Sequence, residues 1–148
     1  MRKYLRGIPE KFMEQIPPEG IGYLCLVRDI LGQDKLPPEN RIGDWEQLFK
    51  DPSDALLSGL PARERELLAL RYGIEDGEPY KTYNDIGVRI KRSEERVRQI
   101  CEKALNRLRD PSHLWYLEAL YDENTDINLK DASERFVEAL GLYFRKPN

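Results

Sequence analysis

Apolar side chains in the second half of the chain recur with the spacing of a helix. Between residues 93 and 109 they form one stripe, and the basic side chains of the same stretch lie off it. The stripe consists of Val97, Ile100, Ala104, Leu105 and Leu108. This pattern predicts an amphipathic helix that buries one face and leaves another free to meet an anion.

A shorter helix is predicted directly before this one. Thr82, with Asp85 three residues later, is typical of a helix start, because the hydroxyl caps early amides and the carboxylate is favoured in the first turn. Ser93, followed by two glutamates, is a second such start. Gly87 lies between them, where the lack of a Cβ lets two helices approach closely. Two helices joined this tightly form a helix-turn-helix, whose second helix can enter the major groove of DNA.

Prolines, glycines and capping residues divide the remaining chain into further helices. They are predicted at about residues 11–16, 19–31, 61–73, 111–121 and 129–144, with shorter segments after Asp44 and Asp51. Asp44 is expected to cap the segment that holds Trp45 and Phe49. The charged residues 63–66 are expected on the solvated side of their helix.

The predicted fold class is therefore all-α, a helical domain with a helix-turn-helix, flanked by short N-terminal helices and a C-terminal amphipathic helix. Residues 54–121 are expected to form that domain, residues 1–53 an N-terminal helical arm or small subdomain, and residues 122–148 a C-terminal helical extension. Two interpretations remain for residues 1–53. Either they pack Trp45 and Phe49 onto the core, which is the commoner use of aromatic side chains, or they dock a partner.

Composition limits the class of protein. A hydrophobic fraction of 40% and a charged fraction of 34% are typical of a soluble helical protein. No apolar run approaches the roughly 20 residues that a membrane-spanning helix requires. The N-terminal residues lack the apolar region of a secretory signal, so the protein is expected to be cytoplasmic.

Catalytic and metal-binding patterns are not found in the sequence. Cys25 and Cys101 lie far apart, and His113 is the single histidine, which predicts neither a disulfide framework nor a zinc site. Cys101 is expected to be a small buried hydrophobic residue. No nucleophile, phosphate-binding or zinc-protease motif is present. We expect no enzyme activity, no metal and no cofactor.

Charge is distributed unevenly along the chain. The net charge is −3, but residues 89–109 contain 8 basic and 3 acidic side chains, which gives a local charge of +5. Acidic flanks oppose the affinity for phosphates that this patch would provide. From spacing alone, the basic face is either a DNA contact or a solvated helix surface.

Three motifs also resemble a known family. GLPARERELLALRYGI (59–74), TYNDIG (82–87) and SEERVRQICEKALNRLRDPS (93–112) resemble, in order and spacing, the fourth conserved region of bacterial primary-type sigma factors. The resemblance covers about residues 54–121, under half of the chain. It implies a helix-turn-helix that contacts the minus-thirty-five element of promoter DNA, and another surface that sits on the beta-subunit flap of RNA polymerase.

Carried over by position, the resemblance implies a set of recognition residues. Arg98 and Gln99 are the residue types that the family has at these positions, and their side chains can hydrogen-bond to guanine, adenine or phosphate. Glu95 also agrees, and it can accept a hydrogen bond from cytosine. Glu94 departs from the family pattern, which usually has arginine at this position. Either the preferred DNA sequence of this chain differs, or protein contacts have replaced DNA contacts. The candidate DNA-binding residues are Arg92, Ser93, Glu94, Glu95, Arg96, Arg98, Gln99 and Lys103.

The resemblance also implies a partner-binding surface. Its candidates are Leu117, Leu120 and Tyr121 in the helix after Arg109, although aromatic residues in helices are more often part of a core. Upstream of residue 54 we recognise none of the promoter-melting helices of sigma factors. An accessory or virus-encoded sigma-like protein, or one that works with a second subunit, therefore fits better than a complete initiation factor.

Two functions from different classes follow. The first is a sigma-like transcription factor or regulator that binds RNA polymerase and promoter DNA through residues 82–109. The alternative is a protein-interaction module that occupies the polymerase flap or a sigma partner without contacting DNA, as an inhibitor or co-regulator. Glu94 and the acidic flanks favour the alternative, whereas Arg98, Gln99 and the local positive charge favour the first.

Overall fold

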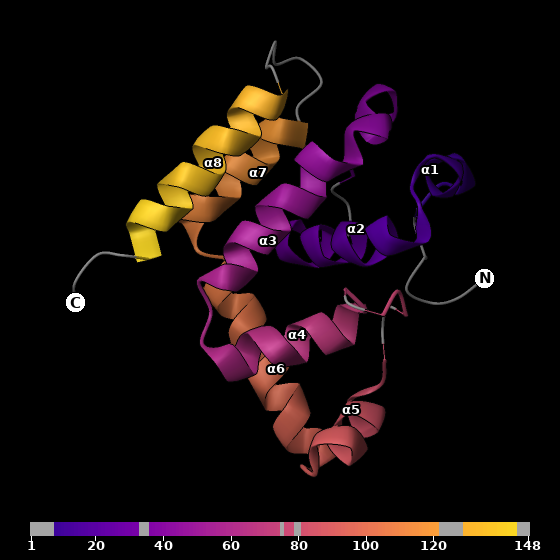
Figure 1. The fold of residues 1–148 in the computed structure, drawn as a ribbon, viewed down its shortest axis with the longest axis vertical. Coiled ribbons are helices and arrows are strands. Elements are labelled where there is room, and N and C mark those ends of the chain that lie inside the picture. The colour runs from indigo at the N-terminus through magenta and orange to yellow at the C-terminus, as the bar shows by residue number, and fades with distance from the viewer. Residues whose placement is uncertain (1–7, 33–35, 75, 79–80, 122–128, 145–148) are drawn as a thin grey trace.

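A computed structural model describes residues 8–32, 36–74, 76–78, 81–121 and 129–144. Within these residues the regular structure is entirely helical, so the all-α fold class is confirmed (Figure 1). The elements in order are α1 (Glu10–Gln15), α2 (Pro18–Leu31), η2 (Glu39–Asp44), η3 (Glu46–Lys50), α3 (Asp51–Ser58), α4 (Ala62–Tyr72), α5 (Tyr83–Ile90), α6 (Glu94–Leu108), α7 (Pro111–Tyr121) and α8 (Leu129–Phe144).

Proline and glycine define several helix ends, as the sequence predicts. Pro61 directly precedes α4, and Gly73 ends it in the left-handed conformation, with φ 64° and ψ 33°. Gly32 ends α2 with φ 114°, a value that a side chain would strain. These two glycines therefore mark the C-terminal ends of α2 and α4.

The predicted cap at Asp44 is wrong. Trp45 keeps right-handed helical dihedrals, with φ −55° and ψ −31°. The chain therefore passes from the 3-10 helix η2 through the π-helical turn η3 into α3 without a new helix start. Because the backbone stays helical, no early amides are left for the Asp44 side chain to cap.

Helix α2 lies at the centre of the core. It contacts α3, α4, α6, α7 and η3, and its side chains from Leu24 to Val27 are almost completely buried. Gly22 allows this position, because a Cβ there would lie 2.1 Å from the backbone oxygen of Tyr72. Phe49 is fully buried and packs against Trp45, with ring centroids 6.2 Å apart. These two aromatic residues therefore serve the core of the chain.

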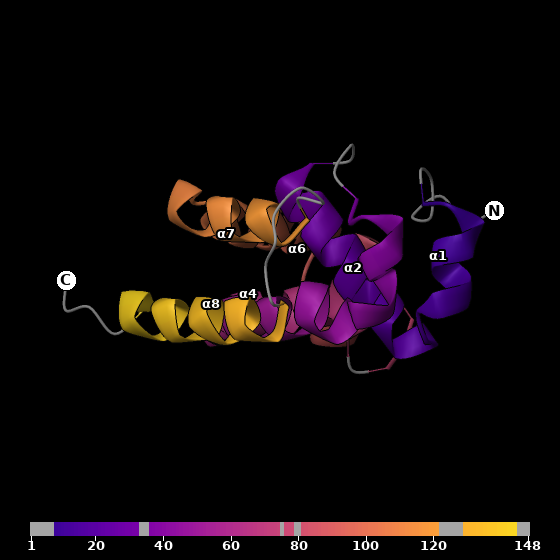
Figure 2. The same cartoon turned by 90° about the horizontal axis from the view of Figure 1, so that it is seen from above.

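The helices form two ends joined by α2 and α3. Helices α4, α5 and α6 make one end (Figure 1). Helices α7 and α8 run side by side at the other (Figure 2), where α8 also contacts α3. The expected boundary between residues 53 and 54 falls within α3, and the division into three parts remains a proposal. No helix in the described ranges has the length and apolar character needed to cross a membrane.

Candidate nucleic-acid interface

Two capped helices build the helix-turn-helix. The backbone N–H of Asp85 donates to the hydroxyl of Thr82 at 3.0 Å, and α5 begins there. The backbone N–H of Arg96 donates to the hydroxyl of Ser93 at 3.1 Å, and α6 begins there. Both predicted caps are confirmed, and each satisfies an amide that has no partner within its own helix.

The turn between α5 and α6 is tight. The backbone N–H of Arg92 donates to the oxygen of Gly87 at 2.9 Å. A Cβ on Gly87 would lie 2.5 Å from the backbone oxygen of Arg92, so the close approach requires glycine, as predicted. Lys91 adopts the left-handed conformation, with φ 60° and ψ 50°. It is the one non-glycine residue with positive φ within the described ranges.

The apolar stripe of α6 faces the core. Val97, Ala104 and Leu108 are fully buried, and Ile100 and Leu105 are partly buried, as the spacing predicts. Cys101 is 1% exposed, which confirms its predicted burial. Helix α6 packs on α4 and α5 through this stripe, and its opposite face is left to solvent.

Polar contacts hold the C-terminal half of α6. The sequence pattern places Glu64 on a solvated face, and this prediction is wrong for that residue. Glu64 lies three positions before Leu67, so it shares the buried side of α4 and accepts a 2.9 Å hydrogen bond from Nε of Arg107. Arg109, just after α6, donates from Nη2 to the backbone oxygen of Asp29 in α2 at 2.9 Å.

The connection into α5 is also fixed by charged groups. Arg71 donates to the backbone oxygen of Lys81 at 2.6 Å, and its guanidinium lies 4.3 Å from the ring centroid of Tyr83. Lys81 in turn donates to Asp76 at 2.7 Å. That hydrogen bond lowers the pKa of the Asp76 carboxyl. The end of α4 and the start of α5 are thus held together.

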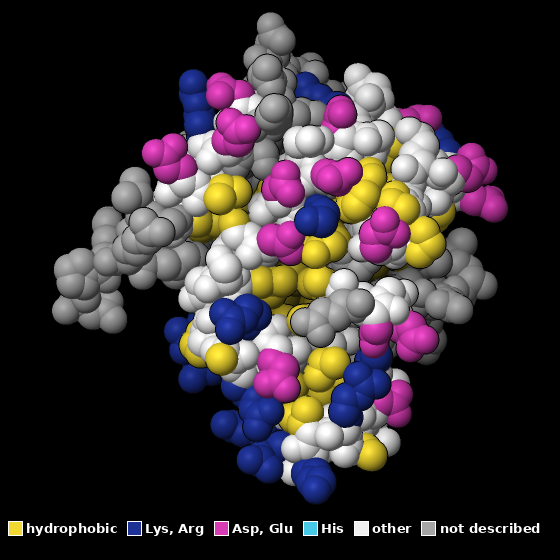
Figure 3. Space-filling view, in the orientation of Figure 1, with side chains coloured by type: hydrophobic (Ala, Val, Ile, Leu, Met, Phe, Trp, Pro, Cys, Tyr) yellow, Lys and Arg dark blue, Asp and Glu magenta, His cyan; other side chains and the backbone are white. Residues whose placement is uncertain are grey.

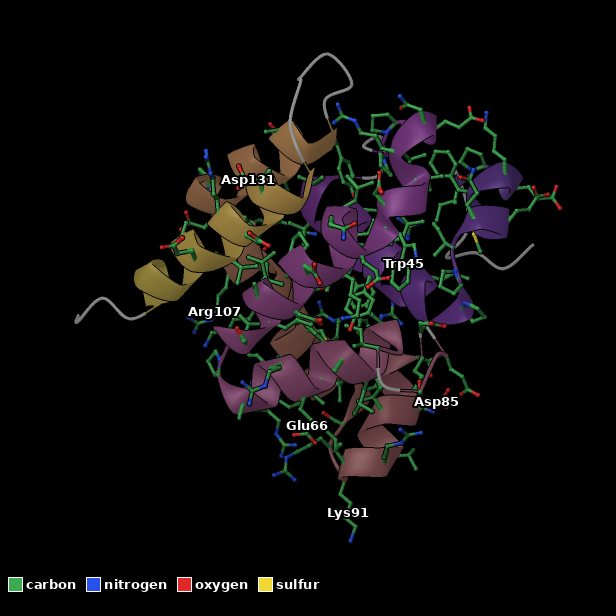
Figure 4. All side chains as sticks on the ribbon, turned by 45° about the horizontal axis from the view of Figure 1, so that its top comes forward. Trp45, Glu66, Asp85, Lys91, Arg107 and Asp131 are labelled. Carbon is green, nitrogen blue, oxygen red and sulfur yellow. The ribbon has the colours of Figure 1, made fainter. Side chains whose placement is uncertain are left out.

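The candidate DNA-binding residues lie together at one end of the molecule. Seven of them are exposed on the turn and on the outer face of α6, namely Arg92, Ser93, Glu94, Glu95, Arg96, Gln99 and Lys103. Lys and Arg side chains gather at this end, whereas Asp and Glu predominate toward the other (Figure 3). Lys91 projects from the tip of the turn, away from all the helices (Figure 4).

Arg98 differs from the other members of the set because it is clamped by carboxylates of its own helix. Nε donates to Glu95 Oε2 at 2.9 Å and Nη1 donates to Glu102 Oε2 at 2.7 Å, while Nη2 donates to Glu95 Oε1. The hydrogen bonds that Arg98 donates to Glu95 and Glu102 raise the pKa of Arg98, and the bond from Arg98 lowers the pKa of Glu95. The sequence prediction missed Glu102, although its i+4 spacing from Arg98 is a recognisable signal.

A shallow hollow continues this surface toward the C-terminal end of α6. It has a volume of about 520 Å³ and is lined by Gln99, Glu102, Lys103, Asn106 and Arg107. All five lining residues are of polar type and come from one helix, and both charge signs are represented among them.

The three candidate partner-binding residues in α7 have different positions. Leu117 is fully buried in the core. Tyr121 is partly buried, and burial raises its pKa. Its hydroxyl has no hydrogen-bond partner among the residues that the structure describes. The side chain of Leu120 lies outside the described residues.

Known proteins match the part of the chain that carries this interface. Residues 56–110 match the family model for sigma-70, region 4. The matched segment runs from within α3 to the end of α6 and includes the whole helix-turn-helix. The resemblance predicted from the motifs is thereby confirmed for this segment. Region 4 is a non-enzymatic part of transcription initiation factors, which agrees, for residues 56–110, with the prediction of no enzyme activity.

Several curated relatives are cyanobacterial sigma factors. RNA polymerase sigma factor SigA1 of Synechococcus elongatus is 39% identical over 84 residues, which cover 57% of this chain and 20% of the relative. RNA polymerase sigma-C factor of a Nostoc species is 41% identical over 83 residues, which cover 56% of this chain and 19% of the relative. The chain thus spans about a fifth of the length of these relatives. Comparison with solved structures gives no significant match.

Proposed function

We propose that this chain is a sigma-like transcription factor that binds RNA polymerase and contacts promoter DNA, at a minus-thirty-five-like element, through α5 and α6. One observation carries the proposal. The outer face of α6 and the turn before it present a group of exposed polar residues, and no described helix from outside the matched segment covers the tip (Figure 1). An open basic helix in a helix-turn-helix suits the major groove.

The free cations support this proposal. Five basic side chains on α5, the turn and α6 form no ion pair within the described part of the chain, namely Arg89, Lys91, Arg92, Arg96 and Lys103. Cations of this kind bind phosphates and position a recognition helix. Gln99 and Arg96, on the exposed face of α6, are then the side chains best placed to contact base edges.

RNA polymerase is the proposed protein partner, through the flap of its beta subunit. In this proposal residues 54–121 form the recognition domain, and the flanking segments support it. Tyr121 and Leu120 remain the candidate contacts on α7. Leu117 contributes by holding α7 in the core, because its buried side chain is not available to a partner.

The rival function is a protein-interaction module that occupies the flap or a sigma partner without contacting DNA. One observation favours it. Arg98, the arginine that agrees with the family, is neutralised by Glu95 and Glu102, and Glu94 adds a further negative charge to the first turn of α6. Phosphates are repelled by such a surface.

Binding measurements separate the two functions. Promoter-like duplexes are titrated over a salt series, with and without RNA polymerase, using the native chain and the Arg96→Ala and Arg98→Ala variants. Arg135→Ala is the control, because Arg135 lies on α8 and pairs with Asp131 at 3.3 Å. We expect salt-sensitive binding that weakens in the two α6 variants and not in the control. Binding that is absent in both settings, or indifferent to salt and to these arginines, would disprove DNA recognition, and recovery of polymerase in a pull-down would then establish the rival.

A further inference from the structure

The clamp on Arg98 has a definite geometry. Glu95 lies three residues before Arg98 and Glu102 four residues after it, so one carboxylate flanks the guanidinium on each side along the helix. All three guanidinium nitrogens donate to these carboxylates. The guanidinium is therefore held along the surface of α6 and does not extend outward, as an arginine that reaches into a groove must.

The charges around Arg98 also make it a poor phosphate ligand in this conformation. One guanidinium between two carboxylates gives a cluster with a net charge of −1, so a phosphate gains nothing by approaching it. Arginine has five N–H donors, of which at least three are already used. Guanine offers two acceptors side by side, O6 and N7, whereas a phosphate at an arbitrary position offers no such fixed pair. Only a DNA site that is well aligned with the helix can replace the carboxylates.

We propose that Glu102 is a specificity-determining residue of the interface, a conclusion that rests on the proposed DNA-binding function. With Glu95, it withholds Arg98 from DNA of arbitrary sequence and releases it where an aligned pair of acceptors is present. Glu102 acts through Arg98 and is a positioning residue. Its side chain is well exposed and contributes nothing to the core, so its substitution leaves the fold intact.

The test uses a labelled duplex of random sequence at low salt, where non-specific binding is strongest. Dissociation constants are measured for the full chain and for Glu102→Gln, Arg98→Ala and the double variant. Glu118→Gln on α7 is the control for the loss of one exposed carboxylate far from Arg98. Thermal unfolding of each variant verifies that the fold is retained.

Glu102→Gln is expected to bind the random duplex about three- to fivefold more tightly than the native chain. This gain in affinity should disappear in the Arg98→Ala background. The native chain, the two single variants and the double variant form a double-mutant cycle, which isolates the coupling between the two side chains. Glu118→Gln should bind as the native chain does. An unchanged affinity for Glu102→Gln, or an equal gain with and without Arg98, would overturn the inference and leave the proposed function standing. If no variant binds any duplex with or without polymerase, the proposed function fails, and the inference fails with it.

Discussion

The hydroxyl of Tyr72 donates a 2.6 Å hydrogen bond to a carboxylate oxygen of Asp29. Tyr72 ends α4, within the segment that matches sigma-70 region 4, and Asp29 belongs to α2, outside it. The same residue, through its backbone oxygen, accepts the hydrogen bond from Arg109 after α6. The N-terminal segment is thus hydrogen-bonded to the end of α4 and to the end of α6, the second helix of the helix-turn-helix.

Tyr72→Phe is expected to destabilise the chain by about 1–2 kcal/mol, because a hydrogen bond to a charged acceptor is lost at a buried position. Urea unfolding followed by circular dichroism measures the change. Tyr83→Phe is the matched control, since its main described contact is with the ring. Equal stability of native chain and Tyr72→Phe would show that the bond contributes nothing in solution.

Gly87→Ala tests the close approach of α5 to the turn. The added Cβ would lie 2.5 Å from the backbone oxygen of Arg92, so the turn must shift, at a cost of about 2–3 kcal/mol. Gly43→Ala is the control, because a Cβ there meets nothing within 4 Å. Equilibrium unfolding of both variants gives the comparison. A Gly87→Ala protein as stable as Gly43→Ala would contradict the geometry of the turn.

Lys91→Gly is expected to stabilise the chain by about 1 kcal/mol. Lys91 occupies the left-handed region, with φ 60°, which strains any residue that has a Cβ. Lys91→Ala removes the same charge and keeps the strain, so it should not be stabilised. The difference in denaturant midpoint between these two variants isolates the backbone effect from the charge. Identical midpoints would argue against a strained residue at this position.

The two cysteines should be unreactive in the folded chain. Burial raises the pKa of Cys25 to about 12 and that of Cys101 to about 11, from an ordinary value of 9.0. Because the thiolate is the reactive form, labelling by a thiol reagent near pH 8 should be slow in the native chain and fast in urea. Rapid labelling of either residue in the native chain would contradict its burial.

The same pKa shifts set a pH dependence of stability. The folded chain holds these two thiol protons more tightly than the unfolded chain does. Their contribution to stability is therefore complete below about pH 9 and is lost progressively as the pH rises toward 11 and 12. Cys25→Ala and Cys101→Ala should each flatten the decline in unfolding free energy between about pH 9 and pH 11. If the decline is unchanged in both variants, titratable groups other than the two thiols cause it.

Local sequence signals were sufficient for most of the fold and for the position of the motif. The caps at Thr82 and Ser93, the glycine at 87 and the stripe of α6 each depend on residues within a few positions of one another. The same holds for the ends of α2 and α4 at Gly32 and Gly73. Helical periodicity and capping act between residues a few positions apart, so a single sequence is sufficient to predict these features.

Three features that the sequence did not predict depend on a distant contact, on a choice among nearby side chains and on backbone conformation, respectively. Glu64 resembles its solvated neighbours, and its burial depends on Arg107, 43 positions away. Arg98 has several carboxylates within reach on its own helix, and spacing alone does not say which of them it binds. Asp44 fails as a cap because of the backbone conformation of Trp45, which propensity does not determine.

Helix α6 is anchored unevenly along its length. Its last turns are bonded to α4 and α2 through Arg107 and Arg109, whereas its first turn, which contains Glu94 and Arg96, meets solvent. A helix of 15 residues extends about 22 Å, so the exposed first turn of α6 lies about that far from the end that is anchored to α4 and α2. A displacement of α2 would move the solvent-exposed first turn of α6 farther than its anchored last turns. Under the proposed function, a partner that binds the N-terminal helices would thereby change how α6 is positioned on DNA.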